Sequence, residues 1–143
     1  MGDRAAHLQW AAARLAEWIH PLTVSSLHET APVDMPAEAG AFLNAAATGP
    51  TDLTPQALLS VLQAIERERG RQRPFRNAPR TLDLDLILYG DTVMETAGLT
   101  LPHPRFRDRA FVLAPLAEVA PSLVDPVTGL SVAALWQRLT RTP

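Results

Sequence analysis

The sequence predicts a small α+β sandwich, and the order of its expected elements is the main observation behind this prediction. Helix, strand, strand, helix, strand and helix follow one another, and proline-rich loops separate them. The second observation is length, because 143 residues suffice for one ordinary core and not for two. We therefore expect a single domain over 1–143, with a β-α-β-β-α-β plan that lacks its first strand.

The first half of the chain is expected to fold as helix, strand, strand and helix. Leu8 and Leu15 belong to an apolar series at helical spacing. Thr54 followed by Pro55 is a typical helix start, with threonine as the N-cap, and Gly70 is expected to end that helix. Composition indicates the strands. The expected ranges are 3–18 and 54–70 for the helices, and 22–30 and 41–47 for the strands.

The segment Arg80 to Gly90 carries two aspartates on an expected strand. Asp83 and Asp85 alternate with leucines at 82, 84, 86 and 88, and successive side chains of a strand point to opposite faces. The two carboxylates would then share one face, where their like charges need a nearby cation. Mg²⁺ is the usual solution, because one or two protein carboxylates often hold it together with substrate phosphates and water. The same alternation is typical of a strand whose outer face simply meets water, so the pattern alone leaves both interpretations open.

The last third of the chain is expected to be mainly helical. A turn at Gly90-Asp91 ends the aspartate-bearing strand, and short helices are expected over 107–119 and 131–141, with a loop over 121–129 between them. The segment 71–79 is rich in arginine and proline and is expected to be a surface loop that leads into the strand.

Composition excludes several classes of function. The net charge of -2 argues against a dedicated nucleic-acid binder, in which a basic surface would dominate. The positive charge of this chain is instead confined to local stretches of sequence. All 13 basic residues are arginine, which leaves no lysine for a Schiff base or a P-loop. The absence of cysteine excludes a disulfide, a thiol nucleophile and a cysteine zinc site. No apolar run of about 18 residues and no signal-peptide pattern is present, so we expect a cytoplasmic protein without a membrane segment.

Four ordered motifs carry a resemblance to a known family. They are Gly-Arg-x-Arg from Gly70, Pro-Arg-Thr-Leu-Asp-Leu-Asp-Leu from Pro79, Pro-His-Pro around His103, and Arg-x-Phe-Val-Leu-x-Pro-Leu-x-Glu from Arg109. In these motifs the chain resembles 6-hydroxymethyl-7,8-dihydropterin pyrophosphokinase of folate biosynthesis, and the likeness extends from the first helix to Pro143. The resemblance implies a ferredoxin-like α/β sandwich with an antiparallel or mixed central sheet. It also implies that ATP donates its terminal pyrophosphate to the pterin hydroxymethyl group, releasing AMP, with two Mg²⁺ ions at the paired aspartates.

The resemblance also assigns roles to individual residues. Asp83 and Asp85 would bind magnesium, with Asp85 or a metal-bound group accepting the hydroxyl proton, and Arg71 and Arg80 would join Asp85 in catalysis. ATP would be surrounded by Gln63, Glu66, Arg71, Arg73, Arg80, His103 and Arg109. Planar, bidentate guanidinium groups suit phosphate oxygens. The pterin would be bound by Asn44 through hydrogen bonds, by the rings of Phe42 and Phe111, and by Thr30 and Val33.

Several of these residues have a simpler interpretation. Phe42 and Phe111 could belong to the core, and Glu66 lies in a charged stretch that is more often a solvated helix end. His103 is held between two prolines, which favours a fixed ring without proving a function. His28, in an expected strand, is assigned no role.

The sequence departs from the family at two places. The family's first strand ends in a Gly-Ser-Asn-Leu-Gly type segment that would lie at Met1, so we expect the chain to lack this strand, and Asn77-Ala78 replace the usual Trp-Gly. A non-catalytic relative that only binds nucleotide or pterin is therefore one alternative. An RNA-binding ferredoxin-like domain that uses the arginine-rich loop is another, although the aromatic platform of such domains is not visible and only 6% of residues are aromatic. The expected partners are ATP and the pterin, without nucleic acid or membrane, and the expected state is a monomer.

Overall fold

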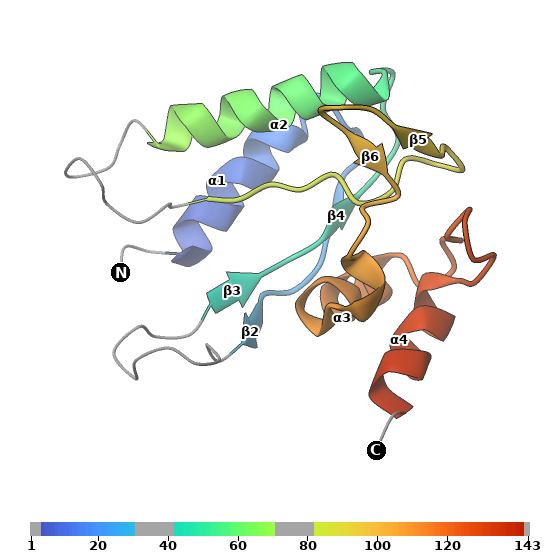
Figure 1. The fold of residues 1–143 in the computed structure, drawn as a ribbon. Coiled ribbons are helices and arrows are strands. Elements are labelled where there is room, and N and C mark those ends of the chain that lie inside the picture. Colours follow the sequence, from blue (N-terminus) through green and yellow to red (C-terminus); the bar gives the residue numbers. More distant parts are fainter. Residues whose placement is uncertain (1–3, 31–41, 71–81, 142–143) are drawn as a thin grey trace.

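The structure is a computed structural model that describes residues 4–30, 42–70 and 82–141 (Figure 1). Helices and short antiparallel strands follow one another along the chain as α1 (Arg4–Leu15), β1 (Thr23–Val24), β2 (His28–Thr30), β3 (Phe42–Asn44), β4 (Ala47–Thr48), α2 (Pro55–Gly70), β5 (Met94–Glu95), β6 (Thr100–Leu101), the 3-10 turn η2 (Phe106–Asp108), α3 (Ala110–Val119) and α4 (Val132–Arg141). This mixture of helices and antiparallel strands confirms the expected α+β class.

The two strands expected in the first half of the chain are present, each in two short pieces. β2 pairs with β3 and β1 pairs with β4, both antiparallel. Ser25 and Ala46 join the two ladders, because the Ser25 N–H donates to the Ala46 carbonyl (2.8 Å) and the Ala46 N–H donates to the Ser25 hydroxyl (2.9 Å). Ser25 is buried, so these bonds satisfy its polar groups away from water. The two ladders are therefore joined end to end in one continuous pair of antiparallel chain segments.

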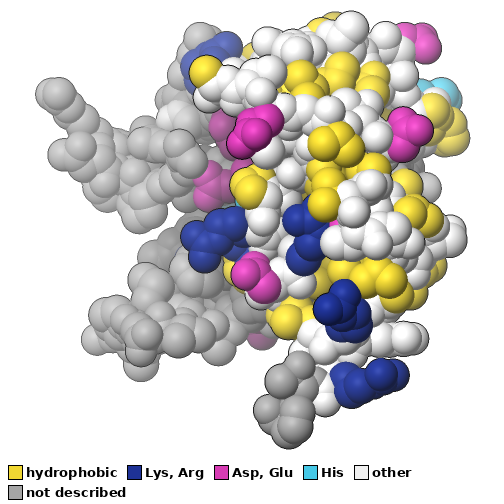
Figure 2. Space-filling model, turned by 45° about the vertical axis from the view of Figure 1, so that its right-hand side comes forward, with side chains coloured by type: hydrophobic (Ala, Val, Ile, Leu, Met, Phe, Trp, Pro, Cys, Tyr) yellow, Lys and Arg dark blue, Asp and Glu magenta, His cyan; other side chains and the backbone are white. Residues whose placement is uncertain are grey.

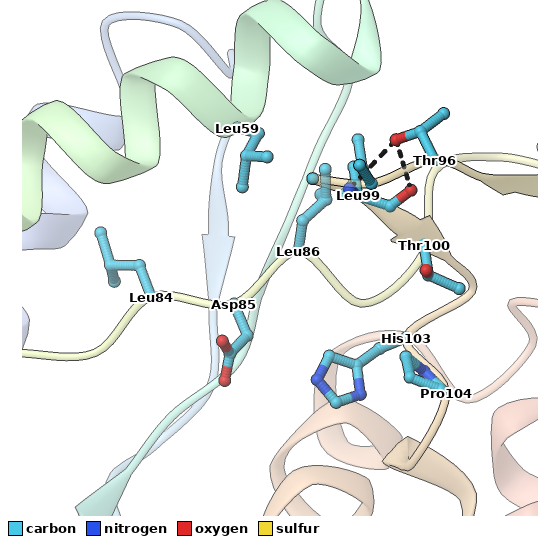
Figure 3. Close-up of a pocket in the computed structure, with 11 residues that line it drawn as sticks. Leu59, Leu84, Asp85, Leu86, Thr96, Leu99, Thr100, His103 and Pro104 are labelled. Carbon is cyan, nitrogen blue, oxygen red and sulfur yellow. Dashed lines mark hydrogen bonds between the residues drawn. The ribbon is translucent and has the colours of Figure 1, made fainter.

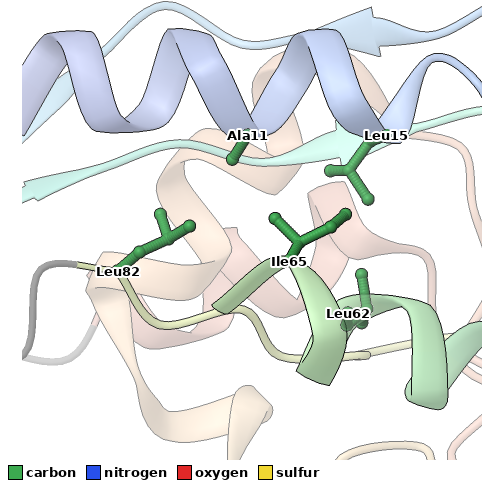
Figure 4. Packing of buried hydrophobic residues seen from close by; sticks show 5 residues of the cluster. All are labelled: Ala11, Leu15, Leu62, Ile65 and Leu82. Atoms are coloured by element: carbon green, nitrogen blue, oxygen red, sulfur yellow. The ribbon is translucent and has the colours of Figure 1, made fainter. Parts of the chain in front are cut away.

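Helices α1 and α2 pack against each other through the first of two cores. Figure 4 shows the side chains at its centre: Ala11, Leu15, Leu62, Ile65 and Leu82. The predicted start of α2 is confirmed, because the Thr54 hydroxyl accepts the Ala57 N–H (3.2 Å) as an N-cap does. Gly70 is the last residue of α2, as expected. The core thus fixes both helices and the beginning of the aspartate-bearing segment.

The second core lies at the carboxyl end of the chain. Phe106, Leu113, Leu116, Val132 and Leu135 are buried there and join η2, α3 and α4. The helix expected over 107–119 begins later, at Ala110, because residues 106–108 form the 3-10 turn and Arg109 is extended, with φ -113° and ψ 105°. Helix α4 agrees with its expected range to one residue.

The strand expected for the aspartate-bearing segment is wrong for the described residues. Residues 82–89 form no β-ladder with any described part of the chain (Figure 1). Other bonds hold this segment: the Leu84 N–H donates to the Glu66 carboxylate, the Ile87 carbonyl accepts the His103 N–H (2.8 Å), and the Tyr89 hydroxyl donates to the Leu53 carbonyl. Two backbone groups that a strand would use for pairing are thus bonded elsewhere, the Leu84 N–H to a side chain and the Ile87 carbonyl to a loop.

The turn that follows this segment forms as expected. The Thr92 N–H donates to the Tyr89 carbonyl (2.9 Å), and Gly90 adopts a φ of 55°. That angle lies in the left-handed region that glycine enters without steric cost. The turn directs the chain into β5 and β6, which pair with Met94 opposite Leu101.

The surface of the described residues carries mixed charge. On the face drawn in Figure 2, arginine side chains stand as separate groups among apolar, neutral and acidic ones. The positive charge on this face is local, as the composition indicates. None of the helices in the described part of the chain combines the length and apolar character that a membrane crossing requires.

Candidate functional site

One pocket brings together Asp85 and His103, two of the residues expected to act on substrates. It has a volume of about 280 Å³ and lies between α2, the aspartate-bearing segment and the β5–β6 turn (Figure 3). Its wall is formed by Leu59, residues 84–86, residues 96–100 and His103-Pro104. The sequence placed Asp85 and His103 in separate motifs, and the fold brings them to one cavity.

The aspartate-bearing segment keeps the predicted alternation although it forms no ladder. Leu82 is buried and Leu84 is half-buried, whereas Asp83 and Asp85 are exposed. In Figure 3 the Leu84 and Leu86 side chains point toward α2, and Asp85 projects from the other side of the segment, where His103 lies. Burial of the leucines against α2 therefore orients the carboxylate of Asp85 into the pocket.

Helix α2 presents a second face to this segment. Leu59, Gln63 and Glu66 recur at helical spacing. Leu59 lines the pocket, and the half-buried Glu66 carboxylate accepts the Leu84 N–H. Gln63 is exposed between them and is not part of the pocket wall. Glu66, expected at ATP, thus holds the segment that carries the aspartates.

His103 is fixed by two hydrogen bonds. Its backbone N–H donates to the Ile87 carbonyl (2.8 Å), which ties it to the aspartate-bearing segment. Its ring Nδ1 accepts the Arg105 N–H (3.2 Å). In the neutral ring the proton then resides on Nε2, because Nδ1 is used as an acceptor. The ring therefore offers one donor to an oxygen ligand.

The β5–β6 turn supplies a wall of the pocket that the sequence analysis missed. The Thr96 hydroxyl donates to the Leu99 carbonyl (2.9 Å) and accepts the Leu99 N–H (3.1 Å), so it is used within the turn. The Thr100 hydroxyl makes no hydrogen bond to another described residue, and it lies at the pocket. Leu99 and Leu101 are buried on either side of Thr100. This alternation is a signal that could have identified Thr100.

Arg109 and Phe111 lie together at the start of α3. The Arg109 guanidinium carbon is 5.7 Å from the centroid of the Phe111 ring, within the range of a cation–π contact. Phe111 is 43% exposed, so the alternative of a core residue is wrong for it. Residues expected at ATP and at the pterin are therefore neighbours here, and neither belongs to the pocket wall.

The remaining residues expected at the pterin lie along the β2–β3 ladder. Asn44 is opposite His28 in the register, and Thr30 is opposite Phe42. Directly opposed residues of an antiparallel pair project to the same face, so Asn44 and His28 share one. Helix α3 contacts both strands. Val33, Arg71, Arg73 and Arg80 lie outside the described residues.

The carboxylate of Glu118, to which the sequence analysis assigned no role, joins α3 to β2 and the residues before it. Glu118 accepts the Ser26 N–H (2.7 Å), the Ser26 hydroxyl (2.7 Å) and His28 Nε2 (2.8 Å). The bond from His28, followed by the two from Ser26, lowers the pKa of Glu118 to about 2. The only signal in the sequence was that Glu118 closes the last of the four motifs.

The two aspartates fit a magnesium ion by their donor chemistry. Both carboxylates are exposed, and hard cations prefer oxygen ligands. Within residues 4–30, 42–70 and 82–141, no three or more His, Cys, Asp or Glu side chains gather into a ligand group. A pair of carboxylates that leaves the rest of the shell to phosphate and water is the arrangement that Mg²⁺ commonly uses. Asp83 and Asp85 would hold such an ion.

Carboxylates and a histidine donor are groups with which proteins bind metal-associated phosphates. A sequence model of the 7,8-dihydro-6-hydroxymethylpterin-pyrophosphokinase (HPPK) family matches residues 1–121. The chain belongs to this family, which confirms the resemblance seen in the motifs.

Individual relatives agree with the family match. A 2-amino-4-hydroxy-6-hydroxymethyldihydropteridine pyrophosphokinase of Bacillus subtilis is 43% identical over 130 residues, covering 90% of this chain and 77% of the relative. A protein of the same name from Synechocystis sp. is 48% identical over 101 residues, covering 71% and 52%. The folic acid synthesis protein fol1 of Pneumocystis carinii is 41% identical over 124 residues, covering 85% and 16%. The chain thus spans about half of the Synechocystis relative and a small part of the fungal one.

Proposed function

We propose that this protein transfers pyrophosphate from ATP to 6-hydroxymethyl-7,8-dihydropterin, giving AMP and the pterin diphosphate. The observation that carries the proposal is the pocket shared by Asp85 and His103, which come from two family motifs far apart in the chain. Family membership supplies the substrates. An RNA-binding role has no comparable support, because such domains need an aromatic platform and only 6% of the residues are aromatic.

The reaction is a displacement at the β-phosphorus of ATP. The hydroxymethyl oxygen forms a bond to that phosphorus, the bond to the oxygen bridging the α- and β-phosphates breaks, and AMP leaves with the electron pair. Asp85 is the group we assign to take the hydroxyl proton, since its carboxylate is exposed at the pocket. His103 would donate from Nε2 to a phosphate oxygen, and Arg109 would add a permanent positive charge.

Magnesium and the arginine-rich segment complete the proposal. Mg²⁺ held by Asp83 and Asp85 would neutralise charge on the phosphates. Gln63 would contact the nucleotide from α2, and Arg71, Arg73 and Arg80 would bind its phosphates. Asn44 would hydrogen-bond the pterin, with Phe111, Phe42, Thr30 and Val33 around it. Positioning and charge neutralisation account for most of catalysis in reactions of this kind, because the protein forms no covalent bond to substrate.

The nucleotide product tests the proposal directly. The protein is incubated with Mg²⁺, the hydroxymethyl pterin and ATP labelled at the β-phosphate, and the products are separated by chromatography. We expect AMP to accumulate and the label to move to the pterin, and we expect Asp85→Asn to slow both. Accumulation of ADP would contradict pyrophosphoryl transfer. Binding of both substrates without any transfer would support the non-catalytic alternative.

We also propose that the chain is one domain over 1–143 of the ferredoxin-like type. In this arrangement residues 82–86 run along α2, with their leucines toward the first core. Their alternating burial supports this, because period-two burial is the pattern of a strand with one buried face. Urea unfolding followed by circular dichroism and by tryptophan fluorescence should give coincident transitions, and two separate transitions would contradict a single domain.

A further inference from the structure

Glu118 lies at the carboxyl end of α3 and binds the segment that leads into β2. Its Oε2 accepts the Ser26 N–H, and its Oε1 accepts both the Ser26 hydroxyl and His28 Nε2. A negative charge in the last turn of a helix is unfavourable, because the helix dipole is negative there. The donors from Ser26 and His28 offset this placement. The three bonds connect residues about ninety positions apart in the chain.

The bonds connect the two parts of the fold that carry the residues assigned to the pterin. Phe111 lies in the first turn of α3, and Asn44 lies in β3, directly opposite His28. His28 and Asn44 share one face of the ladder. Because the His28 ring reaches Glu118, this face is turned toward α3. Glu118 therefore sets the position of the β2–β3 ladder relative to α3.

The two parts differ in how firmly the rest of the fold holds them. Helix α3 is anchored by Leu113 and Leu116, which are buried in the second core against Val132 and Leu135 of α4. Strands β2 and β3 have three residues each. A two-stranded ladder of this length is marginal without packing support. Loss of the Glu118 bonds should therefore let the ladder shift, while Ser25 and Ala46 keep it joined to β1 and β4, and leave α3, with Arg109 at its start, in place.

We infer that Glu118, acting through Ser26 and His28, is a positioning residue for the pterin substrate. It holds Asn44 at the correct distance from Phe111 without contacting the substrate itself. The inference rests on the proposed function for the identity of the ligand. The inference predicts an effect on binding of the pterin and not of ATP. The groups assigned to ATP and its metal, which are Arg109, His103 and the aspartates, lie on parts of the fold that other contacts hold.

The test uses substitutions that remove single donors or the acceptor. Glu118→Gln keeps the size of the side chain and places an amide N–H₂ against at least one of its donors. His28→Leu removes the ring donor, whereas His28→Gln keeps an N–H donor. Glu17→Gln is the matched control, since Glu17 is another exposed carboxylate in a helix-end ion pair, 3.2 Å from Arg14 Nε. Each protein is examined by thermal unfolding, by pterin fluorescence for Kd, and by kcat and KM for both substrates.

We expect Glu118→Gln and His28→Leu to raise the Kd and KM for the pterin about tenfold, because small displacements of a binding group are costly. The KM for ATP and kcat should stay within about twofold. His28→Gln should restore most of the affinity, and Glu17→Gln should change none of these values. A purely structural role would instead lower the melting temperature and affect both substrates alike.

The outcomes separate this inference from the proposed function. Wild-type protein that binds the pterin but forms no AMP would refute the proposed reaction, and the pterin Kd values would still decide the role of Glu118. An unchanged pterin Kd in folded Glu118→Gln would overturn the inference, as would wild-type protein that binds no pterin. If Glu118→Gln does not fold, Ser26→Ala removes one donor and keeps the Ser26 N–H, and it must show the same selective effect.

Discussion

Asp125 is the residue whose substitution should destabilise the fold most clearly. Its side chain is fully buried, and its carboxylate accepts Arg107 Nε (2.5 Å), Arg107 Nη2 (3.0 Å), the Val127 N–H (3.0 Å) and the Thr128 hydroxyl (2.8 Å). These bonds tie η2 to the loop before α4. Asp125→Asn keeps the shape of the side chain, removes the charge and turns an N–H₂ group toward one set of donors.

The magnitude follows from the ion pair. The bond from Arg107, with those from Thr128 and Val127, lowers the pKa of Asp125 from 3.8 to about 2. A shift of this size stabilises the folded state by about 2 kcal/mol at neutral pH. Arg107 also loses its partner, and breaking a buried pair costs about 3–5 kcal/mol. Because the Arg107 side chain is 27% exposed, water can reach it, and we expect a loss of about 3 kcal/mol.

Urea unfolding followed by circular dichroism measures this difference. At pH 7 we expect Asp125→Asn to unfold about 3 kcal/mol more easily and to melt about 10 °C lower. A lowered carboxyl pKa contributes its full stability above the unfolded value of 3.8, and this contribution is lost as the pH falls toward 2. The difference in free energy of unfolding between wild type and variant should therefore become smaller below about pH 4.

Asp108→Asn is the control for this experiment. Asp108 is exposed, follows Arg107 directly and forms no side-chain hydrogen bond to another described residue. Its substitution should change stability by less than about 0.5 kcal/mol. Equal effects of the two substitutions, or a gap that stays constant down to pH 2, would refute the reasoning about the Arg107–Asp125 pair.

Three other expectations follow, two from the proposed site and one from the cap of α2. ATP affinity measured by calorimetry should depend on Mg²⁺ in the wild type and not in Asp85→Ala; equal affinities with and without Mg²⁺ in both proteins would exclude a metal site there. Arg71→Ala and Arg80→Ala should lower kcat far more than pterin affinity, because phosphate charge changes most in the transition state, and a selective loss of pterin affinity would contradict this assignment. Thr54→Ala should cost about 1 kcal/mol in urea unfolding through loss of the α2 N-cap, and no change would contradict the capping role.

The helices were predictable because their signals are local. The N-cap at Thr54 and the final Gly70 define α2 within a few residues of chain. The apolar spacing in α1 is equally short in range, and its residues Ala11 and Leu15 are buried as a helical stripe requires. In α3 the start was misplaced, because Arg107 pairs with Asp125 across a loop and the preceding residues form a 3-10 turn. That long-range bond has no signature in the local sequence.

The site was predictable in part. Family motifs identified Asp85 and His103, and the structure places both at one pocket. Thr100 was missed although its neighbours are buried in alternation. Glu118 and His28 were missed for a different reason, because their bond joins positions about ninety residues apart and depends on how α3 packs against the ladder. Neither residue type nor spacing reports such a contact.

The aspartate-bearing segment shows what a period-two pattern does and does not encode. Alternation predicted which side chains would be buried, and the leucines at 82, 84 and 86 are indeed less exposed than Asp83 and Asp85. It could not predict a hydrogen-bonding partner, because side-chain hydrophobicity specifies a face and says nothing about which backbone lies alongside. The Glu66 carboxylate and the His103 N–H bond this segment instead. The orientation of Asp85 therefore depends on the burial of its leucine neighbours, and we expect polar substitution of Leu84 or Leu86 to disturb the site even though neither residue contributes a polar group to it.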